Sequence, residues 1–463
     1  MYKLILLVIL IPFLSWGSEN TILERYISTA LQNNLALKQQ DFAYQKSVSA
    51  LKEARGLFLP SLEIQARYSR AGGGRTIDIP VDQFLNPVYQ TLNAILQQNV
   101  FPEDIQGETI VFLREEEHET KIRAVQPIFQ TDIYYNYKIK DNLQNLEQLS
   151  KQAYARLLIA HVKSSYYNYL KTLEIVKLLQ RTQELLEENL RVNEKLVEIQ
   201  KSTRDVVFRS QADLSFLEKQ QADAEKGQVM AQAYFNFLLN LPQDQIIETI
   251  SLDSLPSPLL ITLSDAEITA LQNREEVKQL SYAIEAAQNG VKLNRGKFLP
   301  NVFAVFDYGY QGEFYRFSEQ DDFWMASAIL QWNLFNGFQD KRKIQQARLE
   351  QKKLETRQLE LQNQIKLEVR DAYYGVGVAL KNLQSSEDQL RSQQKSFEIV
   401  DKKYQQGMAL QVEYLDARNS YIRSEIDLIM ARFDYYISHA NLERITGSYP
   451  LSSHSLKHSE QEH

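Results

Sequence analysis

The sequence predicts an α+β membrane protein built from two internal repeats, and three observations support this fold class. The segment RGLFLP at Arg55–Pro60 returns as RGKFLP at Arg295–Pro300, and each copy leads into alternating apolar and polar residues. Each copy then continues into a very long helical run, and the chain starts with a short apolar leader. The repeat constrains the whole fold, because each copy is expected to form the same order of elements.

The composition excludes several classes of function. The chain has 463 residues, a formal net charge of −7 and no cysteine. Its acidic balance argues against a nucleic-acid partner, because neutralising phosphates requires a basic face. Without cysteine there can be no disulfide, thiolate metal site, cysteine nucleophile or lipid-bearing cysteine. We expect neither a cofactor nor a metal site, and we interpret residues 448–463 as a disordered tail, although its three histidines leave metal binding open.

The leader over residues 1–17 has the pattern of a secretory signal peptide. An apolar run extends from Leu4 to Leu14 behind a basic start, and Ser15 and Gly17 are small enough to allow cleavage. A transmembrane helix is the alternative. The run is shorter than the ~20 residues that a helical span requires.

The first repeat, residues 18–241, contains two predicted helices over 21–33 and 36–55, followed by strands at about 61–70 and 120–128. In the first strand Leu62, Ile64, Ala66 and Tyr68 share one face, and polar residues share the other. This alternation is typical of a barrel strand with lipid on one side and water on the other. The long segment 71–119 between the strands is expected to lie outside the cell.

The second repeat, residues 264–447, contains strands predicted at about 301–311 and 322–334. Aromatic residues near strand ends are expected to lie at the membrane interfaces: Tyr68, Tyr308, Tyr310, Trp324 and Trp332. An ordinary half-buried soluble sheet is the alternative that alternation alone does not exclude. Because four strands cannot close a barrel and no strand edge can face lipid, the architecture requires an oligomer.

Long helices follow the strands in both repeats, at about 130–201 and 337–405. Each is followed by a return helix, at 206–241 and 411–444, and residues 242–263 link the repeats. The first long run lacks Gly and Pro over about 70 residues, which corresponds to ~105 Å of helix. In the second, Val376, Leu383, Leu390, Phe397 and Tyr404 keep a seven-residue step, which indicates coiled packing. A soluble coiled-coil rod would show the same periodicity.

This order of elements, with the duplicated Phe-Leu-Pro strand entries and the element Tyr404–Gly407 followed by Val412–Ala417, resembles the outer-membrane efflux protein family, the TolC-like channel-tunnels. The resemblance covers about residues 20–447. It implies a homotrimer in which each chain contributes four strands to a twelve-stranded barrel and helices to a long periplasmic barrel. It also implies an outer-membrane location in a Gram-negative cell.

The resemblance assigns roles to residues at the ends of the helical hairpins. It implies that Glu413 and Asp416 form an acidic ring at the periplasmic entrance, and that Gly407 forms the hairpin turn. It further places Tyr404 opposite Asp205 in a polar link that closes the entrance. The sequence differs from the family at Ala409, where some members have an arginine. The closed state is therefore expected to have fewer or different polar contacts at the entrance.

The predicted function is passive transport through the exit duct of a tripartite efflux pump or a type I secretion system. The expected partners are outer-membrane lipid, a periplasmic adaptor protein and an inner-membrane transporter of the RND or ABC type, which would supply the energy. We find no catalytic constellation and expect no enzymatic activity. The alternative function is a structural or adhesive coiled-coil protein of the envelope.

Overall fold

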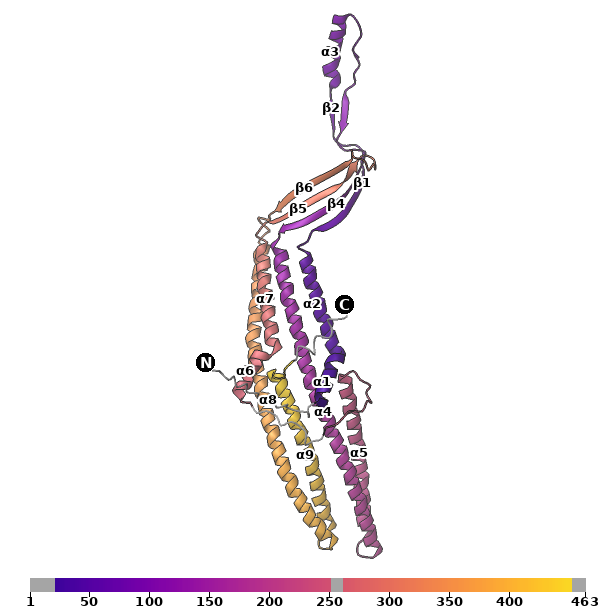
Figure 1. Cartoon of the computed structure of the whole chain (residues 1–463), viewed down its shortest axis with the longest axis vertical. Helices are drawn as coiled ribbons and strands as arrows, with labels where there is room; N and C mark the ends of the chain where they lie inside the picture. The colour runs from indigo at the N-terminus through magenta and orange to yellow at the C-terminus, as the bar shows by residue number, and fades with distance from the viewer. Residues whose placement is uncertain (1–20, 251–260, 452–463) are drawn as a thin grey trace, which may run out of the picture. The chain divides into compact units, whose positions relative to one another are not determined.

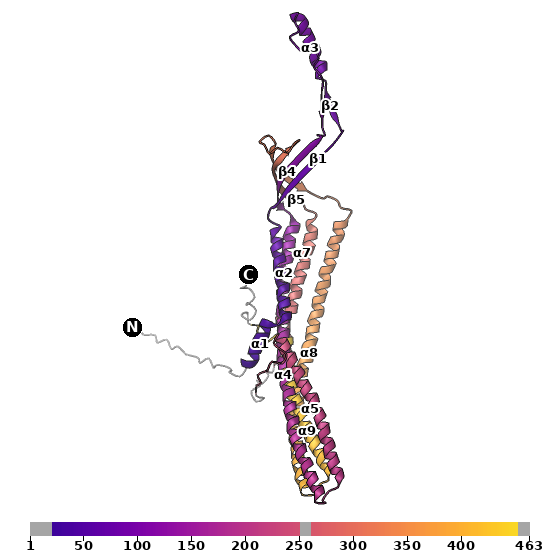
Figure 2. The same ribbon diagram turned by 90° about the vertical axis from the view of Figure 1, so that its right-hand side faces the viewer.

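The computed structural model describes residues 21–250 and 261–451. The predicted signal peptide, part of the predicted linker and residues 452–463 of the predicted tail lie outside this range. The chain forms two compact units (Figures 1 and 2). The first comprises Met1–Ser49, Asp141–Ala286 and Glu350–His463, and the second comprises Ala50–Lys140 and Ala287–Leu349.

One order of elements, two helices, two paired strands, a long helix and a return helix, occurs twice in the described chain. The first set is α1 (Thr21–Asn33), α2 (Leu35–Gly56), β1 (Ser61–Arg70), β4 (Glu116–Phe129), α4 (Thr131–Glu198) and α5 (Arg204–Leu238). The second is α6 (Leu263–Asn273), α7 (Glu275–Gly296), β5 (Asn301–Gly312), β6 (Asp322–Gln331), α8 (Gln339–Gln405) and α9 (Gln411–Thr446).

The core of the first unit is aromatic and aliphatic. Its fully buried side chains include Tyr166 on α4, Phe235 on α5 and Phe433 on α9. Tyr26 packs edge-on against Phe235 with ring centroids 5.0 Å apart. A second cluster joins α6, α8 and α9 around Ala266 and Ala270 and contains the fully buried Ile365 and Val369.

The second unit contains a four-stranded antiparallel sheet in the order β1-β4-β5-β6 (Figure 1). Two strands differ in length from the sequence prediction. β4 begins at Glu116 instead of about residue 120, because residues 116–119 continue the pairing with the end of β1. β6 ends at Gln331 instead of residue 334, and a loop leads from there into α8.

The segment between β1 and β4 has structure of its own. It contains β2 (Thr76–Ile79) paired with β3 (Glu108–Val111), and the helix α3 (Val81–Leu96) lies between these two strands in the sequence. The buried Asn93 side chain accepts hydrogen bonds from the backbone N–H groups of Val100 and Phe101 at 3.0 and 2.9 Å, and so holds the return loop.

Two helical hairpins, α4–α5 and α8–α9, lie in the first unit over most of their length (Figures 1 and 2). In the second, Gly407 takes the left-handed conformation (φ 74°), and Met408 N–H donates to the carbonyl of Lys403 at 2.8 Å. In the first, Gln200 takes this place with φ 59°. The two hairpins therefore turn in the same way, although only one of them has the glycine that favours this conformation.

Candidate functional site

The sheet of the second unit has one largely apolar face. The register of the strand pairs brings the alternating residues of all four strands together. The apolar face contains Leu62, Ile64, Ala66, Tyr68, Ile122, Ala124, Phe306, Tyr308, Trp324, Ala326, Ala328 and Leu330. Several of its large side chains are exposed to a degree unusual for a protein surface, Ile64 at 76 % and Trp324 at 70 %.

Charged residues concentrate on the opposite face. Arg123 on β4 donates from Nε and Nη2 to the two carboxylate oxygens of Asp307 on β5, each at 2.8 Å. Lys121 donates to Glu119 at 2.7 Å and lies 3.9 Å from Asp307. Such bidentate charge-assisted bonds fix the side chains in place. The sheet thus separates an apolar surface from a surface of paired charges.

The aromatic residues selected from the sequence occupy different environments. Tyr68, Tyr308 and Trp324 are exposed on the apolar face. Tyr310 shares that face but is partly covered by Phe317, with ring centroids 5.3 Å apart. Trp332 lies beyond the end of β6, where its indole N–H donates to the carbonyl of Phe298 at 3.0 Å. Their proposed position at membrane interfaces remains a prediction.

The second candidate region is where the two hairpins end. The Tyr404 hydroxyl on α8 donates to Oδ1 of Asn193 on α4 at 2.9 Å, and Asn193 in turn donates to Ser210 on α5 at 2.8 Å. Burial raises the pKa of Tyr404, so its hydroxyl remains a proton donor. The described chain therefore contains a buried polar cluster that ties one hairpin to the other.

Asp205 is not the partner of Tyr404 within this chain, which differs from the pairing that the resemblance implied. Asp205 lies in the first turn of α5, where it accepts a hydrogen bond from Thr203 and is 3.9 Å from Arg209. Its side chain is 59 % exposed. The physical reason is local: Asp205 bonds within the start of its own helix, whereas Asn193 is the buried polar group that Tyr404 can reach.

The sequence also did not predict an ion pair that joins the two hairpins. Arg418 on α9 is buried and donates to Asp213 on α5 at 2.8 Å.

A signal for Asn193 does exist in the sequence, because Leu179, Leu186 and Asn193 follow a seven-residue step. A polar residue at an apolar heptad position commonly specifies which helices pair.

Glu413 and Asp416 are both exposed on α9, near its start. The Glu413 carboxylate accepts a hydrogen bond from the backbone N–H of Leu410 at 2.9 Å. Glu413 therefore caps its own helix, which orients the carboxylate at the hairpin end. The acidic ring remains a prediction, since it requires several chains.

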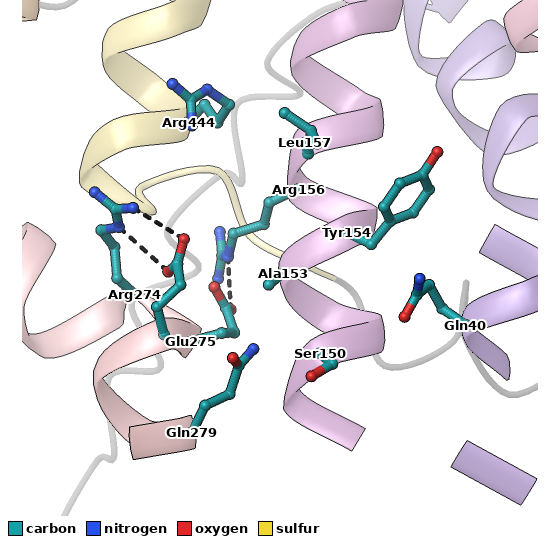
Figure 3. A pocket seen from close by; sticks show the side chains of 11 residues that line it. Gln40, Ser150, Ala153, Tyr154, Arg156, Leu157, Arg274, Glu275, Gln279 and Arg444 are labelled. Atoms are coloured by element: carbon teal, nitrogen blue, oxygen red, sulfur yellow. Dashed lines mark hydrogen bonds and ion pairs between the residues drawn. The ribbon is translucent and has the colours of Figure 1, made fainter. Parts of the chain in front are cut away.

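A polar pocket of about 320 Å³ lies in the first unit and is lined by charged side chains that mostly bind one another (Figure 3). Figure 3 shows Arg156 reaching from α4 to Glu275 at the start of α7, with an N–O distance of 2.6 Å. Arg274 binds Glu276 at 2.9 Å and Glu368 at 2.5 Å. Burial alone would raise the pKa of Glu276, but the bond from Arg274 outweighs it and lowers the pKa.

Replacing Arg274 by Met is expected to destabilise the first unit by about 2 kcal/mol at pH 7. This is less than the ~3–5 kcal/mol for breaking a fully buried pair, because both glutamates are partly exposed. A carboxylate with a lowered pKa stabilises the fold above its ordinary pKa of about 4.5 and loses this effect as pH falls. Urea unfolding should therefore show a difference at pH 7 that shrinks below about pH 4.5.

Arg391→Met is the matched control for this prediction. Among the residues that the structure describes, Arg391 pairs only with the exposed Asp388, 3.6 Å away, so its loss should leave unfolding nearly unchanged. An Arg274→Met variant as stable as the wild type at pH 7, or a deficit that grows as the pH falls, would contradict the assigned role of the ion pair.

No helix within residues 21–250 and 261–451 is long and apolar enough to cross a membrane. The same residues contain no group of three or more His, Cys, Asp or Glu side chains arranged to hold a metal ion.

A comparison with protein families gives the decisive match. Residues 268–448 match the family model described as outer membrane efflux protein. The second repeat of the chain thus resembles this family. Its name gives the location of its members, the outer membrane, and thereby confirms the predicted location. The family is defined by efflux and not by a catalysed reaction.

Three solved structures of membrane proteins share the fold of this chain. The Campylobacter jejuni CmeC outer membrane channel is 15% identical, with a TM-score of 0.75 over 94% of this chain and 90% of that one. The open state of the Neisseria gonorrhoeae MtrE outer membrane channel is 18% identical, with a TM-score of 0.74 over 92% and 89%. A membrane protein from Pseudomonas aeruginosa is 15% identical, with a TM-score of 0.76 over 93% of both chains. No curated protein matches the chain.

Proposed function

We propose that three copies of the chain form an outer-membrane exit duct, which conducts cargo passively from the periplasm to the exterior. The observation that carries the proposal is the four-stranded sheet, with exposed apolar residues on one face and paired charges on the other. An apolar face of this kind suits lipid, and a charged face suits a water-filled interior. The family match supports the same conclusion.

The two open edges of the sheet, β1 and β6, are the reason for an oligomer. Neighbouring strands in the order β1-β4-β5-β6 are all antiparallel, so β1 and β6 run in opposite directions. β6 of one copy can therefore pair antiparallel with β1 of the next. Three copies would close a ring of twelve strands without an edge exposed to lipid.

The hairpins would form the wall and the entrance of the duct. In a symmetric trimer every residue appears three times around the axis, so Glu413 and Asp416 would give a ring of carboxylates that attracts cations. Gly407 would set the turn behind this ring. The bond between Tyr404 and Asn193, which joins the hairpins within each chain, would hold the entrance narrow.

We infer that the energy for transport comes from other proteins, because a duct in the outer membrane has no source of its own. A periplasmic adaptor protein docking on the hairpins would join it to an inner-membrane transporter of the RND or ABC type. The duct would then serve a tripartite efflux pump or a type I secretion system.

Cysteine cross-linking tests the trimer directly, because the chain has no cysteine of its own. Ala66→Cys on β1 combined with Ala326→Cys or Ala328→Cys on β6 places thiols on the same face of the two edges. Mild oxidation should give covalent species of two and three chains and nothing larger.

The single-cysteine chains are the controls, and they should give no species of three chains. A double-cysteine chain that remains monomeric in the membrane, or that forms an open-ended ladder, would count against a closed ring. An open-ended ladder would favour the structural coiled-coil alternative.

A further inference from the structure

A cleft of about 700 Å³ lies in the second unit, between the loop after β6 and the first turns of α8. This volume is within the range of small-molecule sites. The loop supplies an apolar wall, and one face of α8 supplies a cationic wall. The lining of the cleft includes Leu334, Phe335, Phe338, Lys341, Ile344 and Arg348.

The apolar wall is unusually exposed. Leu334, Phe335 and Phe338 are 77, 71 and 67 % exposed, and they follow directly on the apolar face of β6. Gly337 and Phe338 both take left-handed conformations, with φ of 52° and 60°. This conformation is unfavourable for a bulky residue, and such strain is concentrated at functional positions. It places the Phe338 ring edge-on to Phe335, with centroids 5.3 Å apart.

The cationic wall consists of Lys341 and Arg348. They are seven residues apart, two helical turns, so they lie on one face of α8 with Ile344 between them. Within the described residues neither side chain forms an ion pair or a hydrogen bond with the protein. Asp340 also lines the cleft, so two cations face one carboxylate and the lining keeps a net positive charge. A net positive charge beside an exposed apolar wall indicates an amphiphilic anion.

The equivalent junction of the first repeat does not share this charge. Residues 332–349 contain four cations, Lys341, Arg342, Lys343 and Arg348, and one acid, Asp340. Residues 126–141 contain two cations, Lys138 and Lys140, and two acids, Asp132 and Asp141. The excess positive charge is thus confined to the second junction, in a chain whose net charge is −7.

We propose that this cleft binds the head group of an anionic phospholipid. Lys341 and Arg348 would bind the phosphate, and the first acyl carbons would lie against Leu334, Phe335 and Phe338. Basic residues beside a membrane-spanning segment attract anionic lipids in this way. The inference rests on the proposed function, because it requires the apolar face of β6 to face lipid.

The test is native mass spectrometry of the delipidated full-length protein titrated with phosphatidylglycerol or with phosphatidylcholine. The wild type should bind phosphatidylglycerol at least about tenfold more tightly. The Lys341→Gln, Arg348→Gln variant should lose this preference and keep its affinity for phosphatidylcholine. The matched variant Lys138→Gln, Lys140→Gln removes two charges from the first junction and should keep the preference.

Conductance and subunit number are measured on the same preparations. These measurements distinguish a failure of the lipid site from a failure of the proposed duct. A conducting trimer that binds both lipids equally overturns the lipid site alone. Loss of trimers in the Lys341→Gln, Arg348→Gln variant, with no lipid preference in the wild type, would assign the cleft to a neighbouring copy instead. A wild type without trimers or conductance would overturn the proposed function.

Discussion

Substituting Gly309 by Val is expected to prevent the sheet from forming. Gly309 lies in the middle of β5 opposite Lys121 of β4. A Cβ atom there would overlap the carbonyl oxygen of Thr120 and lie 2.6 Å from Cα of Lys121. Both are backbone atoms, so only a shift of the strands can relieve the clash. Overpacking of this kind costs about 3 kcal/mol or more.

The measurement is the amount of the proposed trimer in outer-membrane fractions, which should fall about a hundredfold at this energetic cost. Gly227→Ala in the middle of α5 is the control. Apart from the neighbouring backbone of α5 itself, no described atom lies within 4 Å of a Cβ added there. Alanine is favoured over glycine in helices by about 1 kcal/mol, so stability should rise slightly. Normal trimer yield from Gly309→Val would show that β4 and β5 do not pack as closely as described.

The sequence predicted those features that depend on local patterns. Alternation in residues 62–68 identified the face of β1, because side chains alternate along any strand. The absence of Gly and Pro after Phe129 predicted a helix that extends over 68 residues in the structure. Gly407 predicted a turn, since its left-handed conformation is one that glycine adopts easily.

Features that depend on contacts between distant segments were beyond the sequence. Tyr404 and Asn193 are 211 residues apart, and their bond depends on how α4 and α8 are rotated about their axes. At Gln200 the fold overrides a local preference. The hairpin holds this residue in the left-handed conformation, which residues other than glycine disfavour. The start of β4 was missed for a related reason, since its charged first residues are strand only through pairing with β1.

Replacing Asn193 by Ala is expected to open the entrance of the proposed duct. The substitution leaves Tyr404 and Ser210 without their bonds to this side chain. Each lost buried hydrogen bond costs about 1 kcal/mol, and the loss would occur in all three copies of the proposed trimer. The closed state would thus lose about 3 kcal/mol or more, enough to shift the ratio of closed to open entrances about a hundredfold. Planar-bilayer recordings at one salt concentration should show larger unitary conductance than the wild type.

Tyr404→Phe removes one hydroxyl from the same bond and should act in the same direction with a smaller effect. Asp205→Ala is the informative comparison, because Asp205 is exposed and bonded within its own helix start. Unchanged conductance in Asp205→Ala would assign the closure to the buried cluster around Asn193. If Asp205→Ala instead opened the duct as far as Asn193→Ala, the carboxylate would have to act on a neighbouring copy, and the closure would lie between chains. The position of the closing contact decides what the proposed adaptor would have to displace. A buried bond requires the hairpins to move apart, whereas an exposed carboxylate can be reached at the surface.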